Sequence, residues 1–334
     1  MNTRPLVRLT LPVLTSLLLG ALWMPTAQAI DVQRDDVAQF IRELATEHEL
    51  DPAWVSGVLA DAAVQQSILD AISRPAERVL TWGEYRDIFI QPERIAAGVA
   101  FYREHAPTLA RIEAETGVSR GMILGIIGVE SYYGRITGKH RVVDALATLG
   151  FDYPPRAKFF RNELAEAFVL AAEEQLDIGT LMGSYAGAMG PPQFIPSSYR
   201  AYAVDGDGDG QRDLIGSWPD IMASVANYFA VHKWQSGQPV AARGELSAKA
   251  TAVPLQDQLQ LQSTVGQLSR SGLLFATDLG TDAAAGAWQL EGKAGTEYWV
   301  GFDNLYVITR YNRSVMYALA AWQLGEAVLQ EAAL

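Results

Sequence analysis

The feature that most constrains the fold is an apolar segment, residues 121–134, with the sequence GMILGIIGVESYYG. Helical spacing places Gly121, Gly125 and Gly128 on one side of a predicted helix. Each glycine lowers helix propensity by up to ~1 kcal/mol. What glycine allows is the close approach of a second backbone, because it has no side chain to hold that backbone away. We therefore expect this helix to be central and tightly packed.

A single carboxylate, Glu130, ends the apolar run. On a helix it shares a face with Ile123, Ile126 and Ile127, which would remove it partly from water. Gly134 is typical of a helix end, so the acid would lie near the negative end of the helix dipole. Both effects raise the pKa of a carboxyl group, as a general acid at neutral pH requires. A rim residue without a catalytic role fits this segment equally well.

Composition and charge exclude several classes of protein and several kinds of site. The 334 residues are 49% hydrophobic and 19% charged, which allows a sizeable core and is atypical of a disordered chain. The absence of cysteine excludes disulfides, thiolate metal sites, a cysteine nucleophile and a lipid anchor on an N-terminal cysteine. A net charge of -12 makes nucleic acid and anionic membranes poor partners.

Residues 1–29 have the organisation of a secretory signal peptide. Arg4 and Arg8 form a positive region, an apolar run over 9–23 follows, and Ala27-Gln28-Ala29 is a cleavage site with small residues. No later stretch is long and apolar enough to span a membrane. We therefore predict an exported protein without stable membrane insertion after cleavage. An uncleaved anchor is the alternative.

A second dense motif covers residues 183–199, GSYAGAMGPPQFIPSSY. Its glycines and prolines prevent a long regular element. Ser184, Tyr185, Gln193 and Phe194 offer hydroxyl, amide and aromatic groups. This mixture suits a loop that lines a polyhydroxyl ligand, which needs both planar apolar rings and directional hydrogen bonds. A purely structural turn is an equal alternative.

The acidic stretch 205–220 is predicted to bind calcium. Acids at positions 1, 3 and 5 and glycine at position 6 match the first half of an EF-hand loop. Position 12 is Gly216 instead of the usual glutamate, and a longer loop would use a later acid. An array of Asp-Gly turns without a metal is the alternative. The predicted ligands are the side chains of Asp205, Asp207, Asp209 and Asp220 and the backbone carbonyl of Gln211.

Periodicity along the whole chain predicts a mainly α (α+β) protein. Alternating leucine and polar residues at 253–262 predict a strand, and residues 306–311 are predicted to be extended. The predicted divisions are a signal peptide (1–29), an N-terminal helical domain (30–115), a core with the acidic loop (116–235), a small β domain (236–303) and a C-terminal helix that completes the core (304–334).

Taken together and in order, these motifs resemble the lytic murein transglycosylase B family. They cover nearly all of the chain after the predicted signal peptide. The stretches that carry the resemblance, besides the acidic loop, are IIGVESYYG at 126–134, VDALATL at 143–149, GSYAGAMG at 183–190, QFIPSSY at 193–199, SVANYF at 224–229 and ITRYN at 308–312.

The resemblance implies a lysozyme-like helical core with an N-terminal helical domain and a small inserted β domain. It implies a periplasmic carbon–oxygen lyase that cleaves the β-1,4 bond between N-acetylmuramic acid and N-acetylglucosamine in peptidoglycan. The product would be a 1,6-anhydro sugar formed without water, with Glu130 as the sole general acid and base. It also implies a structural Ca²⁺, no organic cofactor, glycan strands as the binding partner and other cell-wall enzymes as further partners.

By position, nine residues match groups around the glycan cleft of this family. In this chain Pro155 stands where the family has the first arginine of a pair, and Tyr185 replaces a phenylalanine. The implied substrate-binding residues are Tyr85, Arg156, Ser184, Tyr185, Gln193, Tyr228, Tyr311, Asn312 and Tyr317.

Two other functions remain open at the level of sequence. One is a hydrolytic muramidase on the same scaffold, and the other is a calcium-stabilised cell-wall binding module without catalysis. Ordinary glycosidases need a second carboxylate that flanks the bond. The motif from Ser184 to Gln193 contains none, although Asp144 or Asp152 could approach Glu130 in three dimensions.

Overall fold

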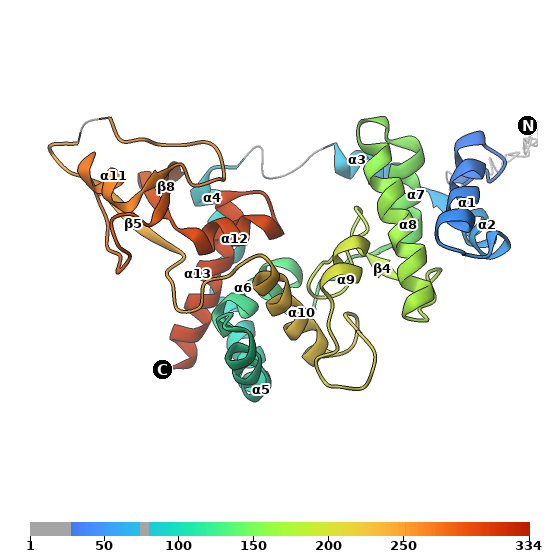
Figure 1. The fold of residues 1–334 in the computed structure, drawn as a ribbon, viewed down its shortest axis with the longest axis horizontal. Helices are drawn as coiled ribbons and strands as arrows, with labels where there is room; N and C mark the ends of the chain where they lie inside the picture. Colours follow the sequence, from blue (N-terminus) through green and yellow to red (C-terminus); the bar gives the residue numbers. More distant parts are fainter. Residues whose placement is uncertain (1–27, 74–79, 251) are drawn as a thin grey trace, which may run out of the picture.

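The structure is a computed structural model that describes residues 28–73, 80–250 and 252–334. These residues are mainly helical, with one five-stranded sheet and two pairs of very short strands among them. The predicted class, mainly α (α+β), is confirmed. Figure 1 shows the sheet at one end of the long axis and the first helices of the chain at the other. None of the described helices is long and apolar enough to cross a lipid bilayer.

The first described elements pack against helices that come much later in the chain. Helix α2 and helix α3 contact α7, and α1 contacts α2. Arg34, which precedes α1, forms an ion pair of 2.9 Å with Asp152 at the end of α7. The elements of this group are β1 (Gln28–Ala29), α1 (Asp35–Glu47), α2 (Pro52–Asp61), β2 (Ala63–Val64), α3 (Gln66–Ile72), α7 (Val142–Asp152) and α8 (Ala157–Glu173).

Most of the predicted signal segment lies outside the described residues. Its last two residues, Gln28 and Ala29, form β1 and pair antiparallel with β2. Cleavage after Ala29 would therefore remove this short strand pair from the mature protein.

A second group of helices surrounds the apolar segment that ends on Glu130. Helix α6 packs along α13, and the two backbones approach each other closely. A Cβ atom on Gly125 would lie 2.0 Å from the carbonyl oxygen of Ala321, and one on Gly325 would lie 1.9 Å from that of Gly121. The group comprises α4 (Trp82–Phe89), α5 (Pro92–Thr116), α6 (Arg120–Ser131), α10 (Trp218–Val231), α12 (Asp303–Tyr311) and α13 (Val315–Ala332).

The contact between α6 and α13 confirms the expectation of a central, tightly packed helix, because no residue with a side chain fits at these positions without moving the partner backbone.

The two groups also divide residues 30–115 between them. Helices α1 to α3 lie with α7 and α8, whereas α4 and α5 lie with α6 and α13. The predicted N-terminal helical domain (30–115) contains both sets of helices, and the predicted domain boundaries stay a prediction.

The sheet lies within the predicted β region. Its strands are all antiparallel in the order β6-β8-β9-β5-β7. Gly295, with φ at 115°, allows the tight turn between β8 and β9. The elements here are β5 (Ala241–Leu246), β6 (Ser263–Thr264), α11 (Val265–Arg270), β7 (Leu273–Leu274), β8 (Ala284–Gly292) and β9 (Gly295–Gly301).

Two predictions about secondary structure are wrong. Residues 253–262 form an irregular loop, not a strand, and the amide group of Gln256 closes it by donating to the carbonyl oxygens of Gln258 and Gln260. Residues 306–311 lie in α12 and are not extended. In that helix Leu305 and Ile308 are buried at a spacing of three, as on one helix face.

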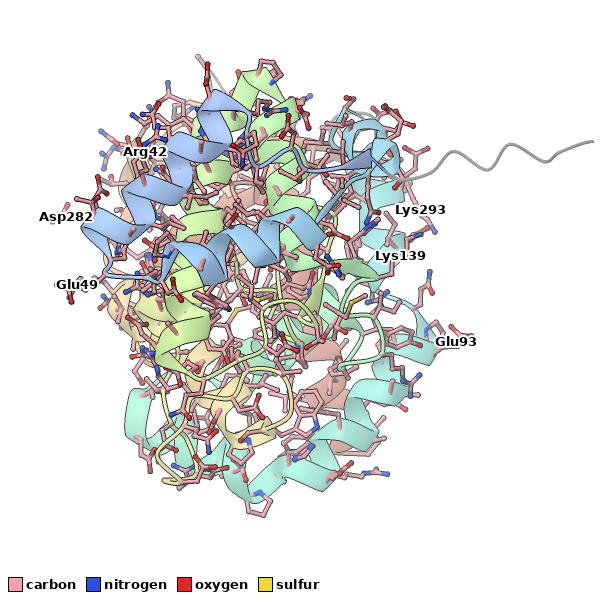
Figure 2. All side chains as sticks on the ribbon, turned by 90° about the vertical axis from the view of Figure 1, so that its right-hand side faces the viewer. Arg42, Glu49, Glu93, Lys139, Asp282 and Lys293 are labelled. Carbon is pink, nitrogen blue, oxygen red and sulfur yellow. The ribbon has the colours of Figure 1, made fainter. Side chains whose placement is uncertain are left out.

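Short elements complete the fold between the two groups. Charged side chains project from the surface, as those of Arg42, Glu49 and Lys139 do in Figure 2. The short elements are β3 (His140–Arg141), the 3-10 helix η2 (Pro154–Arg156), β4 (Met182–Gly183) and α9 (Pro196–Tyr202).

Candidate active site

Glu130 lies in the last turn of α6, half-buried. The helix begins after Ser119, whose hydroxyl accepts from the amide of Met122 at 3.2 Å. Directly after Ser131 the chain enters the left-handed region, at Tyr132 (φ 53°) and Tyr133 (φ 56°). This conformation costs about 1–2 kcal/mol for a residue with a side chain, so the surroundings must impose it.

Packing around the Tyr133 ring supplies that constraint. The ring is buried. A Cβ atom on Gly98 would lie 2.4 Å from its hydroxyl, and one on Gly128 would lie 2.6 Å from it. Two glycines, one on α5 and one on α6, therefore make the space for this tyrosine. The tyrosine in turn fixes the turn that ends α6 next to Glu130.

A phenol from α13 holds the carboxylate of Glu130. The hydroxyl of Tyr317 donates a short hydrogen bond to Oε1 of Glu130. Burial, and then the charge of Glu130, raise the pKa of both Tyr317 and Tyr311 well above the ordinary value. Both phenols therefore stay protonated and can act as hydrogen-bond donors at neutral pH.

Further rings from three elements surround this pair. Tyr311 donates to the carbonyl oxygen of Pro192 at 2.5 Å, and Tyr228 donates to that of Arg310 at 2.6 Å. The rings of Tyr228 and Tyr311 lie 4.8 Å apart. Phe194 lies 5.7 Å from Tyr311. The structure thus brings together predicted site residues that are far apart in the sequence.

Tyr85 is among the groups that influence the pKa of Tyr317, after burial and Glu130, which indicates that it lies near this cluster. It is buried on α4, with its ring 5.2 Å from that of Phe89. Asn312 follows Tyr311 directly, at the end of α12.

The motif at 183–199 forms a compact loop, and two of its predicted binding residues also shape it. The hydroxyl of Ser184 accepts from the amides of Ala186 (3.2 Å) and Ala188 (3.1 Å). Gln193 has φ at 51°, and its side-chain amide donates to the carbonyls of Thr137 (3.0 Å) and Gly190 (2.9 Å). These contacts favour the structural reading of both residues and leave their binding roles as predictions.

A pocket of about 430 Å³ opens beside this loop. Ser184 and Tyr185 line it together with a loop that follows α6 and carries Arg135, Lys139 and His140. Sequence reasoning missed these three cationic or titratable residues. Gly138 was the one residue in the sequence that could have indicated this contact between the two loops. The loops lie so close that a Cβ atom on Gly138 would be 1.9 Å from the carbonyl oxygen of Gly183.

Arg156 lies apart from the tyrosines, in η2. Its guanidinium group sits over the rings of Phe159 and Phe160, at 4.2 and 5.1 Å from their centroids. The structure therefore joins Arg156 to one exposed ring, Phe159, and one buried ring, Phe160, at the start of α8.

Both acids considered as a second carboxylate take part in structural contacts. Asp144 is buried and accepts hydrogen bonds from Arg141 (2.9 Å), from the amide of Ala63 (3.1 Å) and from the side chain of Gln65 (3.0 Å). Asp152 is paired with Arg34. Both acids tie the first helices of the chain to α7.

The acidic loop brings three carboxylates together. Oxygens of Asp205, Asp207 and Asp209 lie within 4.8 Å of one another, and all three side chains are exposed. Hydrogen bonds from backbone amides, chiefly that of Gly210, lower the pKa of Asp205. Three converging anionic oxygens fit a hard cation such as Ca²⁺.

Asp220, the fourth predicted side-chain ligand, is placed differently. It is buried, and its two oxygens accept from the amides of Gly206 (2.8 Å) and Asp213 (2.7 Å). It therefore closes the acidic loop through its backbone. Gln211 donates its own amide to Asp209 at 2.8 Å. The ligand roles of Asp220 and Gln211 remain predictions.

Comparison with known proteins identifies the family. A family model for the transglycosylase SLT domain matches residues 32–326. Membrane-bound lytic murein transglycosylase B of Escherichia coli (strain K12) is 40% identical over 301 residues, which cover 87% of this chain and 81% of that protein. The crystal structure of soluble lytic transglycosylase SltB1 from Pseudomonas aeruginosa is 48% identical, with a TM-score of 0.85, and the match covers 90% of this chain and 100% of that one.

Two further solved structures carry ligands. The Escherichia coli lytic transglycosylase Slt35 in complex with calcium is 38% identical, with a TM-score of 0.83, and the match covers 92% of this chain and 97% of that one. SltB3 from Pseudomonas aeruginosa in complex with NAG-NAM-pentapeptide is 28% identical, with a TM-score of 0.76, over 87% of this chain and 78% of that one. The chain therefore belongs to the lytic murein transglycosylase B family and is a peptidoglycan lytic transglycosylase.

Proposed function

We propose that this enzyme cleaves the β-1,4 bond between N-acetylmuramic acid and N-acetylglucosamine without water and leaves a 1,6-anhydro sugar, with Glu130 as the sole general acid and base. The observation that carries the proposal is the pairing of Glu130 with the buried phenol of Tyr317. The engagement of Asp144 and Asp152 in structural contacts supports a mechanism with one acid.

In the first step protonated Glu130 gives its proton to the glycosidic oxygen as the bond from that oxygen to C1 breaks. Positive charge develops at C1, where the N-acetyl group of the same sugar can assist. In the second step the carboxylate takes the proton of the sugar's own 6-hydroxyl as O6 bonds to C1. The proton given in the first step is thus recovered in the second, and no water is added.

Tyr317 acts as a positioning residue in this scheme. Its hydrogen bond to Oε1 holds the carboxyl group in one orientation. A hydrogen bond to the charged form of an acid also stabilises that form. Tyr317 therefore favours the carboxylate that the second step needs.

Digestion of purified sacculi, followed by mass analysis of the released muropeptides, tests the reaction type. We expect products with 1,6-anhydro ends. Products that contain an added water and no anhydro sugar would instead establish a hydrolytic muramidase. Binding of sacculi without any release would establish a binding module.

We further propose that the enzyme acts in the periplasm after removal of residues 1–29, and that Ca²⁺ binds the acidic loop as a structural ion. Three converging carboxylates and the calcium complex of Slt35 support the second point. N-terminal sequencing of protein from a periplasmic extract tests the first. Release of a mature chain that begins at Ile30 is expected, and retention of the leader in the membrane fraction would contradict it.

A further inference from the structure

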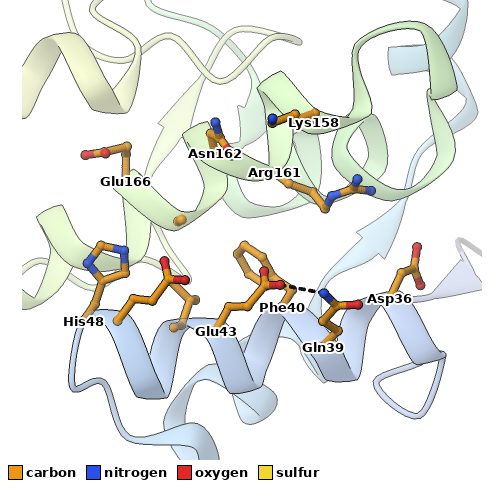
Figure 3. Close-up of a pocket in the computed structure, with 12 residues that line it drawn as sticks. Asp36, Gln39, Phe40, Glu43, His48, Lys158, Arg161, Asn162 and Glu166 are labelled. Atoms are coloured by element: carbon orange, nitrogen blue, oxygen red, sulfur yellow. Dashed lines mark hydrogen bonds between the residues drawn. The ribbon is translucent and has the colours of Figure 1, made fainter.

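Helices α1 and α8 enclose a groove of about 490 Å³ that shares no lining residue with the Glu130 cluster. Figure 3 shows the two helices running along its two sides. The buried side chains of Phe40 and Leu44, together with Ala165, form an apolar floor. A volume of this size falls in the usual range for small-ligand sites, about 300–1,000 Å³.

The two walls of the groove carry opposite charges. Asp36, Glu43 and Glu47 line it from α1. Lys158 and Arg161 line it from α8, together with Glu166, which is paired with Arg200. In Figure 3 the side chains of Glu43 and Asp36 lie on one side, and those of Lys158 and Arg161 on the other. Helix α1 therefore presents an acidic wall and helix α8 a largely basic one.

No ion pair between described residues crosses the groove. Asp36 is paired with Arg34 at 2.7 Å, and Glu43 accepts from Gln39 at 2.7 Å on the same wall. Arg161 donates through one nitrogen to the carbonyl oxygen of Gly150 at 2.9 Å. Glu43 and Glu47 on one wall and Lys158 and Arg161 on the other thus face the space between the helices, and a ligand with both signs of charge complements that space.

The length of the groove fits a short peptide. From Asp36 to Glu47 the acidic wall runs ~16 Å, at 1.5 Å per helical residue. An extended peptide of three or four residues spans about 10–14 Å. Small methyl side chains on such a peptide would contact the floor formed by Phe40, Leu44 and Ala165.

We propose that this groove binds the stem peptide of peptidoglycan as a second anchor, separate from the glycan cleft. The carboxylates of the peptide would face Lys158 and Arg161, and its free side-chain amine would face Glu43 and Glu47. This inference rests on the proposed function, because it takes peptidoglycan as the substrate. Its role is to hold a peptide-bearing strand, so it affects binding and not the chemical step.

Direct binding gives the first test. The probe is the stem tripeptide L-alanyl-γ-D-glutamyl-meso-diaminopimelate, acetylated at its alanine so that the side-chain amine is the only cation, and binding is measured by calorimetry. We expect Lys158→Glu and Glu47→Lys each to weaken binding about five-fold, the upper end for one partly exposed charge pair. Lys249→Glu makes the same charge change on an exposed lysine of the β region and should have no effect.

Cleavage kinetics give the second test. Lys158→Glu should raise KM for peptide-bearing glycan strands and leave kcat unchanged, with no effect on strands from which an amidase has removed the peptides. Equal effects on both substrates, or no tripeptide binding to the wild type, would overturn the groove proposal. Loss of the proposed function is a separate result, since it would appear as the absence of anhydro products from either substrate in the wild-type enzyme.

Discussion

Glu130 on α6 and Glu163 on α8 look alike in sequence, because each interrupts the apolar face of a helix. In the structure they differ in what binds their oxygens. Both oxygens of Glu163 are occupied, by the amide (3.0 Å) and the hydroxyl (2.8 Å) of Ser197 at the start of α9, and the residue is only 4% exposed. Glu130 is half-buried and has the phenol of Tyr317 on Oε1.

The comparison teaches that burial of an acid on a helix does not by itself indicate catalysis. Glu163 is an internal cap that joins α8 to α9. Glu130 is half-buried, and the phenol of Tyr317 is a neutral donor that can bind the carboxyl group in either protonation state. The exposure of the acid and the identity of its hydrogen-bond donors, and not the helix pattern, distinguish the two glutamates.

The largest expected effect comes from Glu130→Gln. This change keeps the shape of the side chain but removes the proton donor, so we expect release of muropeptides to fall about 10²–10⁴-fold. Glu163→Gln is the matched control and should retain activity. Wild-type rates in the Glu130 variant would show that another group is the acid and would break the distinction between the two glutamates.

The exposed acids of the loop from Asp205 to Asp209 are a third kind of carboxylate environment, which removal of calcium tests. No described cationic side chain forms an ion pair with these carboxylates, so a bound ion should stabilise the fold. At a hundred-fold excess over Kd the linkage is about 2.7 kcal/mol. EDTA should lower the Tm of the wild type, but not that of the double variant Asp205→Asn, Asp209→Asn. A Tm unaffected by EDTA, in a protein purified without metal, would contradict the calcium proposal.

Tyr317→Phe tests the phenol without changing its packing. Loss of one hydrogen bond to a charged group should lower kcat by about 10–100-fold, corresponding to ~1.5–3 kcal/mol. KM should change little, because the ring remains in place. Tyr199→Phe is a suitable control, since Tyr199 is also buried but donates to the carbonyl oxygen of Arg212 instead. An equal loss of kcat in both variants would indicate a general structural effect.

The smallest expected effect is the pH dependence of stability due to Glu163. Burial raises the pKa of Glu163 above its ordinary value of 4.5, despite the opposing hydrogen bonds from Ser197. The native state therefore keeps this proton at a pH where the unfolded chain has lost it, and the stability due to Glu163 declines as pH rises past about 4.5.

Glu163→Gln cannot titrate, so its destabilisation of about 1 kcal/mol near pH 4 should become smaller near pH 7. Urea unfolding of the wild type and the variant at both pH values measures this difference. A difference that grows with pH would mean that the hydrogen bonds from Ser197 outweigh burial, and that Glu163 is held as a carboxylate.

Local patterns were sufficient to predict α6 and its carboxylate. The spacing of the glycines predicted that a second backbone lies close to α6, and this backbone is that of α13. The resemblance to a family, and not any local pattern, pointed to Tyr317, because its partner Glu130 lies 187 residues earlier in the chain. Side-chain contacts at such separations have no signature in one sequence.

The wrong predictions have a related cause. The alternating leucines at 253–262 indicated a strand, but the amide of Gln256 satisfies loop carbonyls that a neighbouring strand would otherwise bind. Asp144 and Asp152 remained open as second acids because partners of both come from the start of the chain: Ala63 and Gln65 bind Asp144, and Arg34 binds Asp152. In each case a specific polar contact decided an outcome that hydrophobic periodicity left open.

The glycine contact between α6 and α13 also sets an order in time. Helix α6 can bury its glycine face only when α13 lies against it, and Tyr317 reaches Glu130 on that same helix. A growing or partly translocated chain that ends before residue 315 has neither the packing surface nor the phenol. The pair formed by Glu130 and Tyr317 is therefore completed only when the C-terminal helix is present, and an unfinished chain lacks it.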